Sequence, residues 1–343
     1  MRKRAVAQSS TIAICVFVVR CRHSTRRSFP IMQRSIQIAA LAVLAAAMTA
    51  CGGGNSAVPN MPAHHAPGVQ IATNHSGSMA DAGIDLSKVH VMLPSDVVNP
   101  YSKTDNLHYG GGAVEDHSHI YVVYWGFGKS GYDPSGEKKY MTAFLHNLGG
   151  SPWLNTVHQY YEVVSGKKYH IVNSTGQLKG TWVDNSTVPS APTDAQVQAE
   201  AQSAEQHFGY DADGSYVVAT PHDHNSPGFG TQYCAYHGAT NSKDGVVSYT
   251  NLPYMTDAGQ NCGANFVNPG KRGLLDGVSI VEGHELAESQ TDPQPFNGWV
   301  GPLSEIGDAC AWQGLGDIVL GGKKYAVQPL WSNKIGGCTL HTP

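Results

Sequence analysis

The stretch Asp276-Gly-Val-Ser-Ile-Val-Glu-Gly-His284-Glu-Leu-Ala-Glu288-Ser-Gln-Thr-Asp292-Pro293 decides how we interpret this chain. It predicts a helix over 276–291 that stops before Asp292, because the residue before a proline is pushed out of the helical conformation. His284 and Glu288 are four residues apart, so they lie on one face of that helix. H-E-x-x-H helices use this spacing to present two ligands to zinc, with the intervening Glu as general base.

The pattern indicates a zinc site in which Glu288 replaces the second histidine, since a carboxylate oxygen is also a zinc ligand. A third ligand about twenty residues downstream would resemble the arrangement of the glutamate-type zincins, and there Glu305 is the first candidate and Asp308 the second. Asp292 lies a further turn along the helix and is a further candidate for the rim of the site. Glu285 is then the candidate catalytic base, which would accept the proton of a zinc-polarised water.

A structural interpretation competes with this metal site. Glu288 and Asp292 could form a solvated helix face, and Glu305 could cap a short helix. A protein family can also keep a zincin-like helix after it has lost the metal. Other histidines are weaker candidates. His222 and His224 follow a predicted strand and are better explained as polar loop residues, and His237 follows a cysteine.

Along the rest of the sequence, predicted strands and helices are interleaved, which predicts a single zincin-like α/β domain with a mixed sheet. The other predicted helices are 137–148 and 193–208. The predicted strands are 120–125, 160–164, 169–172, 215–220 and 245–250, with short strands and turns after Gly314.

Four cysteines fall in this domain: Cys234, Cys262, Cys310 and Cys338. An even number of cysteines in an exported chain predicts two disulfides, and three pairings are possible. Proximity favours Cys234–Cys262 and Cys310–Cys338, each worth roughly 3 kcal/mol of stability. A zinc site made of the four thiolates is disfavoured because no two of them have C-x-x-C spacing.

The N-terminal region resembles an export signal. A basic residue precedes the apolar run 36–50, which is shorter than the roughly 20 residues of a membrane span. Small residues then lead to Cys51 in a pattern similar to the lipobox of bacterial lipoproteins, so we expect a lipid anchor there. A plain signal peptide cut near Ala50 is the alternative, and Met32 is a candidate for the true start.

These features divide the chain into a leader and lipoprotein signal peptide over 1–51, a flexible linker over 52–88 and a domain over 89–343. The location expected is the cell envelope, as an outer-membrane or surface lipoprotein attached through Cys51, or secretion. Charged residues make up only 14% of the chain and the formal net charge is −4. Without a basic stripe in the domain, nucleic acid is not an expected partner.

Several motifs together resemble the phosphate-induced protein and Exordium family of secreted plant proteins. They are Tyr109-Gly-Gly-Gly-Ala-Val114, Ile120-Tyr-Val-Val-Tyr-Trp-Gly126, His284-Glu-Leu-Ala-Glu288 and Glu305-Ile-Gly-Asp-Ala-Cys310. The similarity spans about 109–340, nearly the whole domain. It implies an extracellular or cell-wall location but no biochemical activity. The leader, Asp292 in place of Asn and the histidine-rich 222–224 loop depart from the plant pattern.

Two functions follow from these observations. The first is a zinc-dependent metallohydrolase, most plausibly a peptidase, that acts on a peptide or cell-wall substrate. The second is a non-catalytic surface protein that binds a cell-wall polymer or a protein partner and keeps the motif for structure. Abundant Tyr and Trp would suit glycan stacking, though they also suit a core.

Overall fold

The computed structural model describes residues 77–97, 106–302 and 304–342. The leader, Met32 and Cys51 lie outside these residues, as does most of the predicted linker. Within the described part of the chain, no helix combines the length and the apolar character that a membrane crossing requires.

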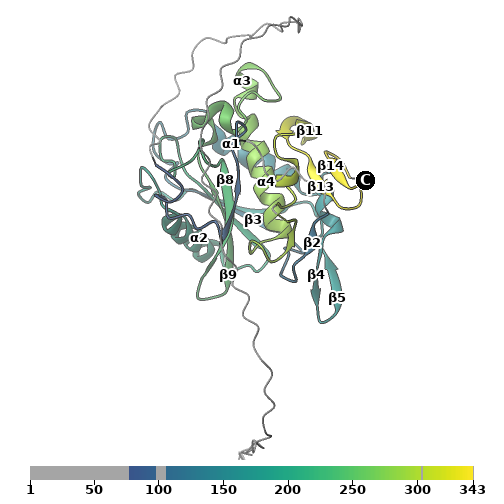
Figure 1. Ribbon diagram of the computed structural model, residues 1–343. Coiled ribbons are helices and arrows are strands. Elements are labelled where there is room, and N and C mark those ends of the chain that lie inside the picture. Colours follow the sequence, from purple (N-terminus) through teal and green to yellow (C-terminus); the bar gives the residue numbers. More distant parts are fainter. Residues whose placement is uncertain (1–76, 98–105, 303, 343) are drawn as a thin grey trace, which may run out of the picture. The chain divides into compact units, whose positions relative to one another are not determined.

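A six-stranded mixed sheet forms the centre of the domain (Figure 1). Its strands in spatial order are β1 (Val89–Met92), β8 (Ala235–Asn241), β9 (Val246–Leu252), β7 (Gly214–Ala219), β3 (His119–Tyr124) and β6 (Leu178–Trp182). The last four run parallel to one another, whereas β8 and β1 are antiparallel to their neighbours. The predicted α/β class with a mixed sheet is therefore confirmed, and β1 forms one edge.

Helices cover both faces of this sheet (Figure 1). They are α1 (Glu137–Leu148), α2 (Asp194–Phe208) and α4 (Asp276–Thr291), and the short α3 (Gly270–Gly273) precedes α4 away from the sheet. Tyr236 of β8 donates a hydrogen bond to Asp194 of α2, and its neighbour His237 contacts Glu285 of α4. Since neighbouring strand residues point to opposite faces, α2 and α4 lie on opposite sides of the sheet.

Most helices and strands predicted from the sequence begin and end in the structure at or near the predicted residues. The bounds of α1 and α4 agree with the sequence, and α2 begins after Thr193, which forms a capping box with Gln196. The predicted strands 160–164 and 169–172 leave a turn over 165–168, and this predicted turn is wrong. Ser165 and Gly166 alone make it, with φ of 52° and 78°, so β4 (Tyr161–Val164) pairs directly with β5 (Lys167–His170). Two left-handed residues are what a tight hairpin requires.

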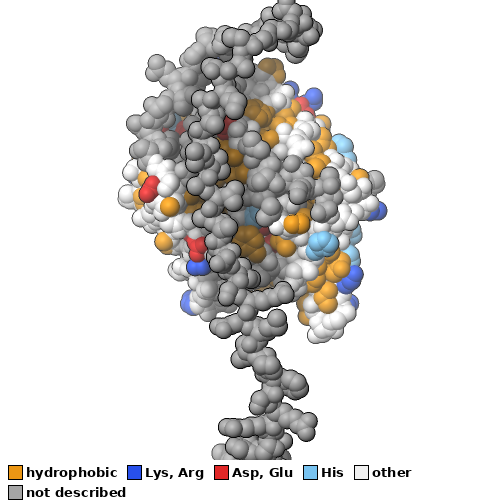
Figure 2. All heavy atoms as spheres, in the orientation of Figure 1, with side chains coloured by type: hydrophobic (Ala, Val, Ile, Leu, Met, Phe, Trp, Pro, Cys, Tyr) orange, Lys and Arg blue, Asp and Glu red, His pale blue; other side chains and the backbone are white. Residues whose placement is uncertain are grey.

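The β4–β5 hairpin leaves apolar side chains in solvent (Figures 1 and 2). Val163, Val164 and Tyr169 are 40%, 49% and 37% exposed. Figure 2 shows hydrophobic and basic side chains side by side over the hairpin.

The boundary predicted between linker and domain is corrected by the residues just before β1. Ala82 is fully buried, Ile84 is nearly so, and the carbonyl of Ala82 accepts a hydrogen bond from the backbone N–H of Asp194. The described residues 77–88 therefore belong to the domain. Their small and polar composition is typical of a linker, but their few apolar side chains pack into the core.

Smaller elements surround the sheet. Two-stranded sheets are formed by β2 (His108–Tyr109) with β10 (Trp299–Val300), β11 (Gly316–Leu320) with β12 (Lys323–Val327), and β13 (Leu330–Ser332) with β14 (Gly337–Thr339). The 3-10 turns are η1 (Leu154–Gln159), η2 (Met255–Asp257), η3 (Gly259–Cys262) and η4 (Asp308–Cys310). Both favoured disulfides are present: Cys234–Cys262 ties the start of β8 to η3, and Cys310–Cys338 ties η4 to β14.

Candidate metal centre

Helix α4 is buried along its whole length, including its charged residues. His284, Glu285 and Glu288 are all 0% exposed. The helix begins where the carboxylate of Asp276 accepts hydrogen bonds from the backbone N–H groups of Val267 and Asn268. Complete burial rules out a solvated face as the explanation of Glu288. Buried charged groups must find partners of opposite charge or a metal ion.

His284 is held by contacts at both ring nitrogens. Its Nε2 lies 3.2 Å from Oε1 of Glu288, and its Nδ1 lies 3.3 Å from the side-chain oxygen of Gln328. Gln328 is fixed in turn, because its amide donates to the carbonyl of Gly307 at 2.8 Å. An acceptor at Nδ1 selects the tautomer whose Nε2 is free to bind a metal. The sequence alone did not identify this acceptor.

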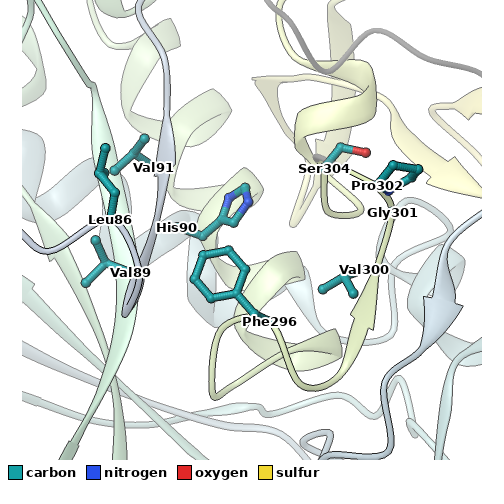
Figure 3. Close-up of a pocket in the computed structure, with 9 residues that line it drawn as sticks. All are labelled: Leu86, Val89, His90, Val91, Phe296, Val300, Gly301, Pro302 and Ser304. Carbon is teal, nitrogen blue, oxygen red and sulfur yellow. The ribbon is translucent and has the colours of Figure 1, made fainter. Parts of the chain in front are cut away.

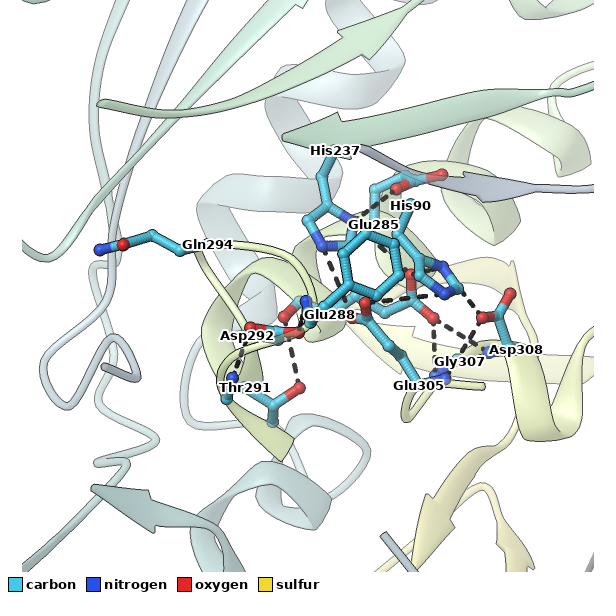
Figure 4. A network of polar contacts seen from close by, with 12 residues as sticks. His90, His237, Glu285, Glu288, Thr291, Asp292, Gln294, Glu305, Gly307 and Asp308 are labelled. Atoms are coloured by element: carbon cyan, nitrogen blue, oxygen red, sulfur yellow. Dashed lines mark hydrogen bonds and ion pairs between the residues drawn. The ribbon is translucent and has the colours of Figure 1, made fainter. Parts of the chain in front are cut away.

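Two further histidines reach the helix from the edge of the sheet. His90 on β1 is the direct cross-strand partner of His237 on β8, and their rings stack with centroids 6.1 Å apart. Figure 4 shows both side chains directed toward Glu288. Nδ1 of His237 lies 3.2 Å from Oε2 of Glu285, and Nδ1 of His90 lies 3.0 Å from Oδ2 of Asp308.

The segment before Cys310 completes the centre. Oε1 of Glu305 lies 3.8 Å from Nε2 of His90, and its Oε2 lies 3.5 Å from Nε2 of His237. Asp308 faces His284 as well as His90, with Oδ1 3.7 Å from Nε2 of His284. Both acidic residues predicted downstream therefore converge on the helix. We call the set the buried cluster: His90, His237, His284, Glu285, Glu288, Glu305 and Asp308.

Gly307 allows this close approach. A Cβ atom at this position would lie 2.6 Å from Nδ1 of His284, so no other residue fits without displacement. The backbone N–H groups of Gly307 and Asp308 donate to Oε1 of Glu288 at 3.2 and 3.0 Å. The glycine thus lets the backbone N–H groups of Gly307 and Asp308, together with the carboxylate of Asp308, lie against the face of α4 that carries His284 and Glu288.

The spacing in the buried cluster fits a cation better than a hydrogen-bond network. Most of the nitrogen-to-oxygen distances are 3.2–3.9 Å, and Oε2 of Glu288 and both oxygens of Glu305 make no hydrogen bond. Two atoms that share a zinc ion at about 2.1 Å lie roughly 3.4 Å apart in a tetrahedron. Imidazole nitrogens and carboxylate oxygens are also the donors that zinc accepts.

Electrostatics couple these groups strongly. Burial opposes ionisation of Glu288, but the charge and hydrogen bond of His284 outweigh it and lower the pKa of Glu288 to about 2. Burial likewise disfavours a charged His284, yet Glu288 raises the pKa of His284 to about 10. Burial and then Glu288 raise the pKa of Glu305 well above its ordinary value and that of Asp308 to about 7. Crowded carboxylates of this kind are what a divalent cation stabilises.

Asp292, predicted as a further ligand, has different partners. Its carboxylate accepts hydrogen bonds from the backbone N–H groups of Phe296, Asn297 and Gly298 at 2.6, 3.2 and 2.7 Å. It therefore shapes the loop after α4. That loop holds Phe296 in the left-handed region, with φ of 75°, and its ring lies 5.6 Å from that of His90.

A pocket of about 230 Å³ adjoins the buried cluster (Figure 3). Its walls come from the edge strand and from the loop around β10, and they are Leu86, Val89, His90, Val91, Phe296, Val300, Gly301, Pro302 and Ser304. Only His90 belongs to both the pocket and the cluster. The pocket thus gives a largely apolar recess beside one of the candidate ligands.

The histidine-rich loop takes no part in this centre. His222 contacts Asp257 through Nδ1, and the backbone N–H of Asp223 and the side-chain amide of Asn225 donate to the same carboxylate. The sequence, by contrast, predicted His237 only as a weak candidate and did not predict His90 as a site residue. Both lie on strands that the sequence did not predict.

Three comparisons with known proteins gave no match. No family model, no curated protein and no solved structure matches this chain. The resemblance to the phosphate-induced protein and Exordium family and the zincin-like architecture stay predictions.

Proposed function

We propose that this chain is a metal-dependent hydrolase, peptidase-like, whose cation is held in the buried cluster. The observation that carries the proposal is the convergence of His90, His237 and His284 on Glu288, each nitrogen-to-oxygen distance being 3.2–3.9 Å among side chains that are 0–8% exposed. Zinc is the cation that this mixture of nitrogen and oxygen donors fits best.

Each residue has a distinct role in this proposal. His284 and Glu288 provide the helix ligands, as the sequence predicted. Glu305 approaches from the opposite side and, by its contacts, pairs with His90 and His237. When bound, zinc would lower the pKa of a coordinated water to near 7 and polarise a substrate carbonyl.

Glu285 is the proposed proton acceptor. Its Oε2 is held at 3.2 Å from His237, whereas its Oε1 is buried and makes no hydrogen bond. One oxygen thus fixes the carboxylate while the other is available for a proton. Burial raises the pKa of Glu285 well above its ordinary value, and a bound dication would lower it again.

The substrate proposed is a peptide chain that places an apolar side chain in the recess beside His90. Phe296, 45% exposed, and Val300 line that recess. Export and lipidation at Cys51 belong to the same proposal, and the two disulfides support it because they persist in oxidising compartments.

The test is the Glu285→Gln variant, measured by zinc content and by cleavage of unfolded casein. Gln keeps an oxygen for His237 but takes no proton, so we expect zinc to stay bound and cleavage to fall by about 10²–10⁴-fold. Glu282→Gln is the matched control, because Glu282 lies one turn earlier on α4, is equally buried and is not a cluster member. Equal cleavage by wild type and Glu285→Gln would refute the role of Glu285.

A further inference from the structure

We propose that the buried cluster binds two divalent cations, one beside His284 and one beside His90 and His237, bridged by Glu288 and Asp308. This inference rests on the proposed function and extends it from a single zinc ion to a pair.

The two bridging carboxylates each face both positions. Oε1 of Glu288 lies 3.2 Å from Nε2 of His284, whereas its Oε2 lies 3.6 Å from His237 and 3.9 Å from His90. The two oxygens of Asp308 also face different imidazoles: Oδ1 lies 3.7 Å from Nε2 of His284, and Oδ2 lies 3.0 Å from Nδ1 of His90. A carboxylate whose two oxygens meet different imidazoles is placed to join two cations.

The second position has a full ligand set of its own. His90 and His237 are cross-strand partners on β1 and β8, and each meets a different oxygen of Glu305, at 3.8 and 3.5 Å. Neither oxygen of Glu305 makes a hydrogen bond, although the residue is 0% exposed. With Glu288, this position is offered two imidazoles and two carboxylates, all oxygen and nitrogen donors that zinc or manganese accepts.

Two compact sets of donor atoms share Glu288, one with His90 and one with His237. The donor atoms of His90, Glu288 and Asp308 lie within 4.8 Å of one another, and so do those of His237, Glu285 and Glu288. Glu288 is common to both sets, and its Oε1 also faces His284. Cations that share a carboxylate in two-metal sites lie about 3.5–4 Å apart.

Charge balance favours two cations over one. The cluster holds four carboxylates, those of Glu285, Glu288, Glu305 and Asp308, and each of them faces at least one imidazole. If all four carboxylates ionise and the imidazoles are neutral, one dication would leave two negative charges buried, which is costly. Two dications balance the four carboxylates.

The position beside His90 is also the one that adjoins the pocket (Figure 3). The ring of His90 faces the recess, whereas His284 is fully buried and does not line the pocket. The second cation would therefore be the one nearer a substrate in the pocket, and the first would complete the bridge from behind.

Metal counting on the purified protein tests this inference. The chain is stripped with a chelator, loaded with Zn²⁺, freed of excess by gel filtration and analysed for zinc per chain. We expect two zinc ions in wild type and one in His90→Asn, which removes a ligand of the second position only. His207→Gln, an exposed histidine on α2, is the matched control and should keep two.

The possible outcomes separate the two proposals. One zinc ion in wild type overturns the pair and leaves the proposed hydrolase intact, whereas no zinc in a folded chain removes both. Two zinc ions in folded His90→Asn overturn the second position as assigned. Loading with Mn²⁺ gives an independent readout: an exchange-coupled signal in electron paramagnetic resonance supports the pair, and an isolated six-line signal at full loading contradicts it.

Discussion

At the scale of single residues, Glu288 is the side chain on which the centre depends most. Its Oε1 accepts two backbone hydrogen bonds and faces His284, and its Oε2 faces His237. A buried carboxylate with this many positive partners is held ionised. It is therefore the strongest single anchor for a cation.

We predict that Glu288→Gln loses tight zinc binding. The neutral amide removes one negative charge and presents a nitrogen that does not coordinate. Zinc at 100 times its Kd should stabilise the wild type by about 2.7 kcal/mol, and this gain should vanish in the variant. Thermal melting with and without zinc measures it. Glu282→Gln should keep the wild-type shift, and a full zinc-induced shift in Glu288→Gln would be inconsistent with the site.

A second residue-scale prediction concerns Asp292, whose carboxylate organises three backbone N–H groups of the following loop. Asp292→Asn loses charge-assisted hydrogen bonds and should cost roughly 1–3 kcal/mol of stability. Zinc content should be unchanged, since the role is structural. Denaturant unfolding and metal analysis check both parts. Loss of zinc at unchanged stability would restore Asp292 to the ligand set.

At the scale of elements, the sequence predicted the helix of the centre but not the strands opposite it. His284, Glu285 and Glu288 follow from helical spacing, which is a local signal. Glu305 and Asp308 followed from their position downstream. The two acidic residues do converge there, although η4 begins only at Asp308.

Strands β1 and β8 were not predicted from the sequence, and the reasons are physical. β1 has only four residues and follows a stretch with linker composition, and β8 is Ala-Tyr-His-Gly-Ala-Thr-Asn, which has few β-branched residues. What stabilises them is their pairing with each other and with β9, and local composition does not encode such non-local pairing. His90 and His237 were missed with them, because their meeting depends on the register of that pairing.

A buried acid at the far end of α4 makes the fold sensitive to pH. Glu115 accepts hydrogen bonds from Ser118 and from Ser215 of β7, and Gln290 of α4 donates to Ser118. Burial raises the pKa of Glu115 from 4.5 to about 8 despite these hydrogen bonds. The folded state therefore binds one more proton than the unfolded state between these values.

Because the folded state holds the extra proton, the stability that this group contributes is present below pH 4.5 and is lost as pH rises toward 8. We predict that Glu115→Gln, which mimics the neutral acid, flattens this decline, which amounts to roughly 5 kcal/mol for a pKa raised from 4.5 to about 8. Urea unfolding at a series of pH values measures it. An unchanged slope in the variant would mean that Glu115 is ionised in the folded protein.

At the scale of the whole molecule, the two disulfides hold the segments that carry the cluster. Cys310 follows Asp308 by two residues and is tied to Cys338 on β14, while Cys234 precedes β8 and is tied to Cys262. Each bridge closes a loop with a sequence separation of 28. The bridges fix both the acidic segment and the strand that bears His237.

We predict that replacing Cys310 and Cys338 together by Ser costs roughly 3–4 kcal/mol, from the lost restraint on the unfolded chain. It should also weaken zinc binding, because Glu305 and Asp308 lose their tether. The matching Cys234→Ser/Cys262→Ser pair should lose similar stability but less zinc affinity, since the ladder of β8 still holds His237. Denaturant unfolding and zinc titration of both variants measure this, and equal affinity losses would contradict it.

The most direct test of the centre as a whole is X-ray absorption at the zinc edge of the loaded protein. The buried cluster predicts a first shell of nitrogen and oxygen at about 2.0–2.1 Å, with the multiple scattering typical of imidazole and no sulfur. His284→Asn should weaken the imidazole signal. A shell of sulfur at about 2.3 Å, or a folded protein that takes up no zinc, would contradict the account.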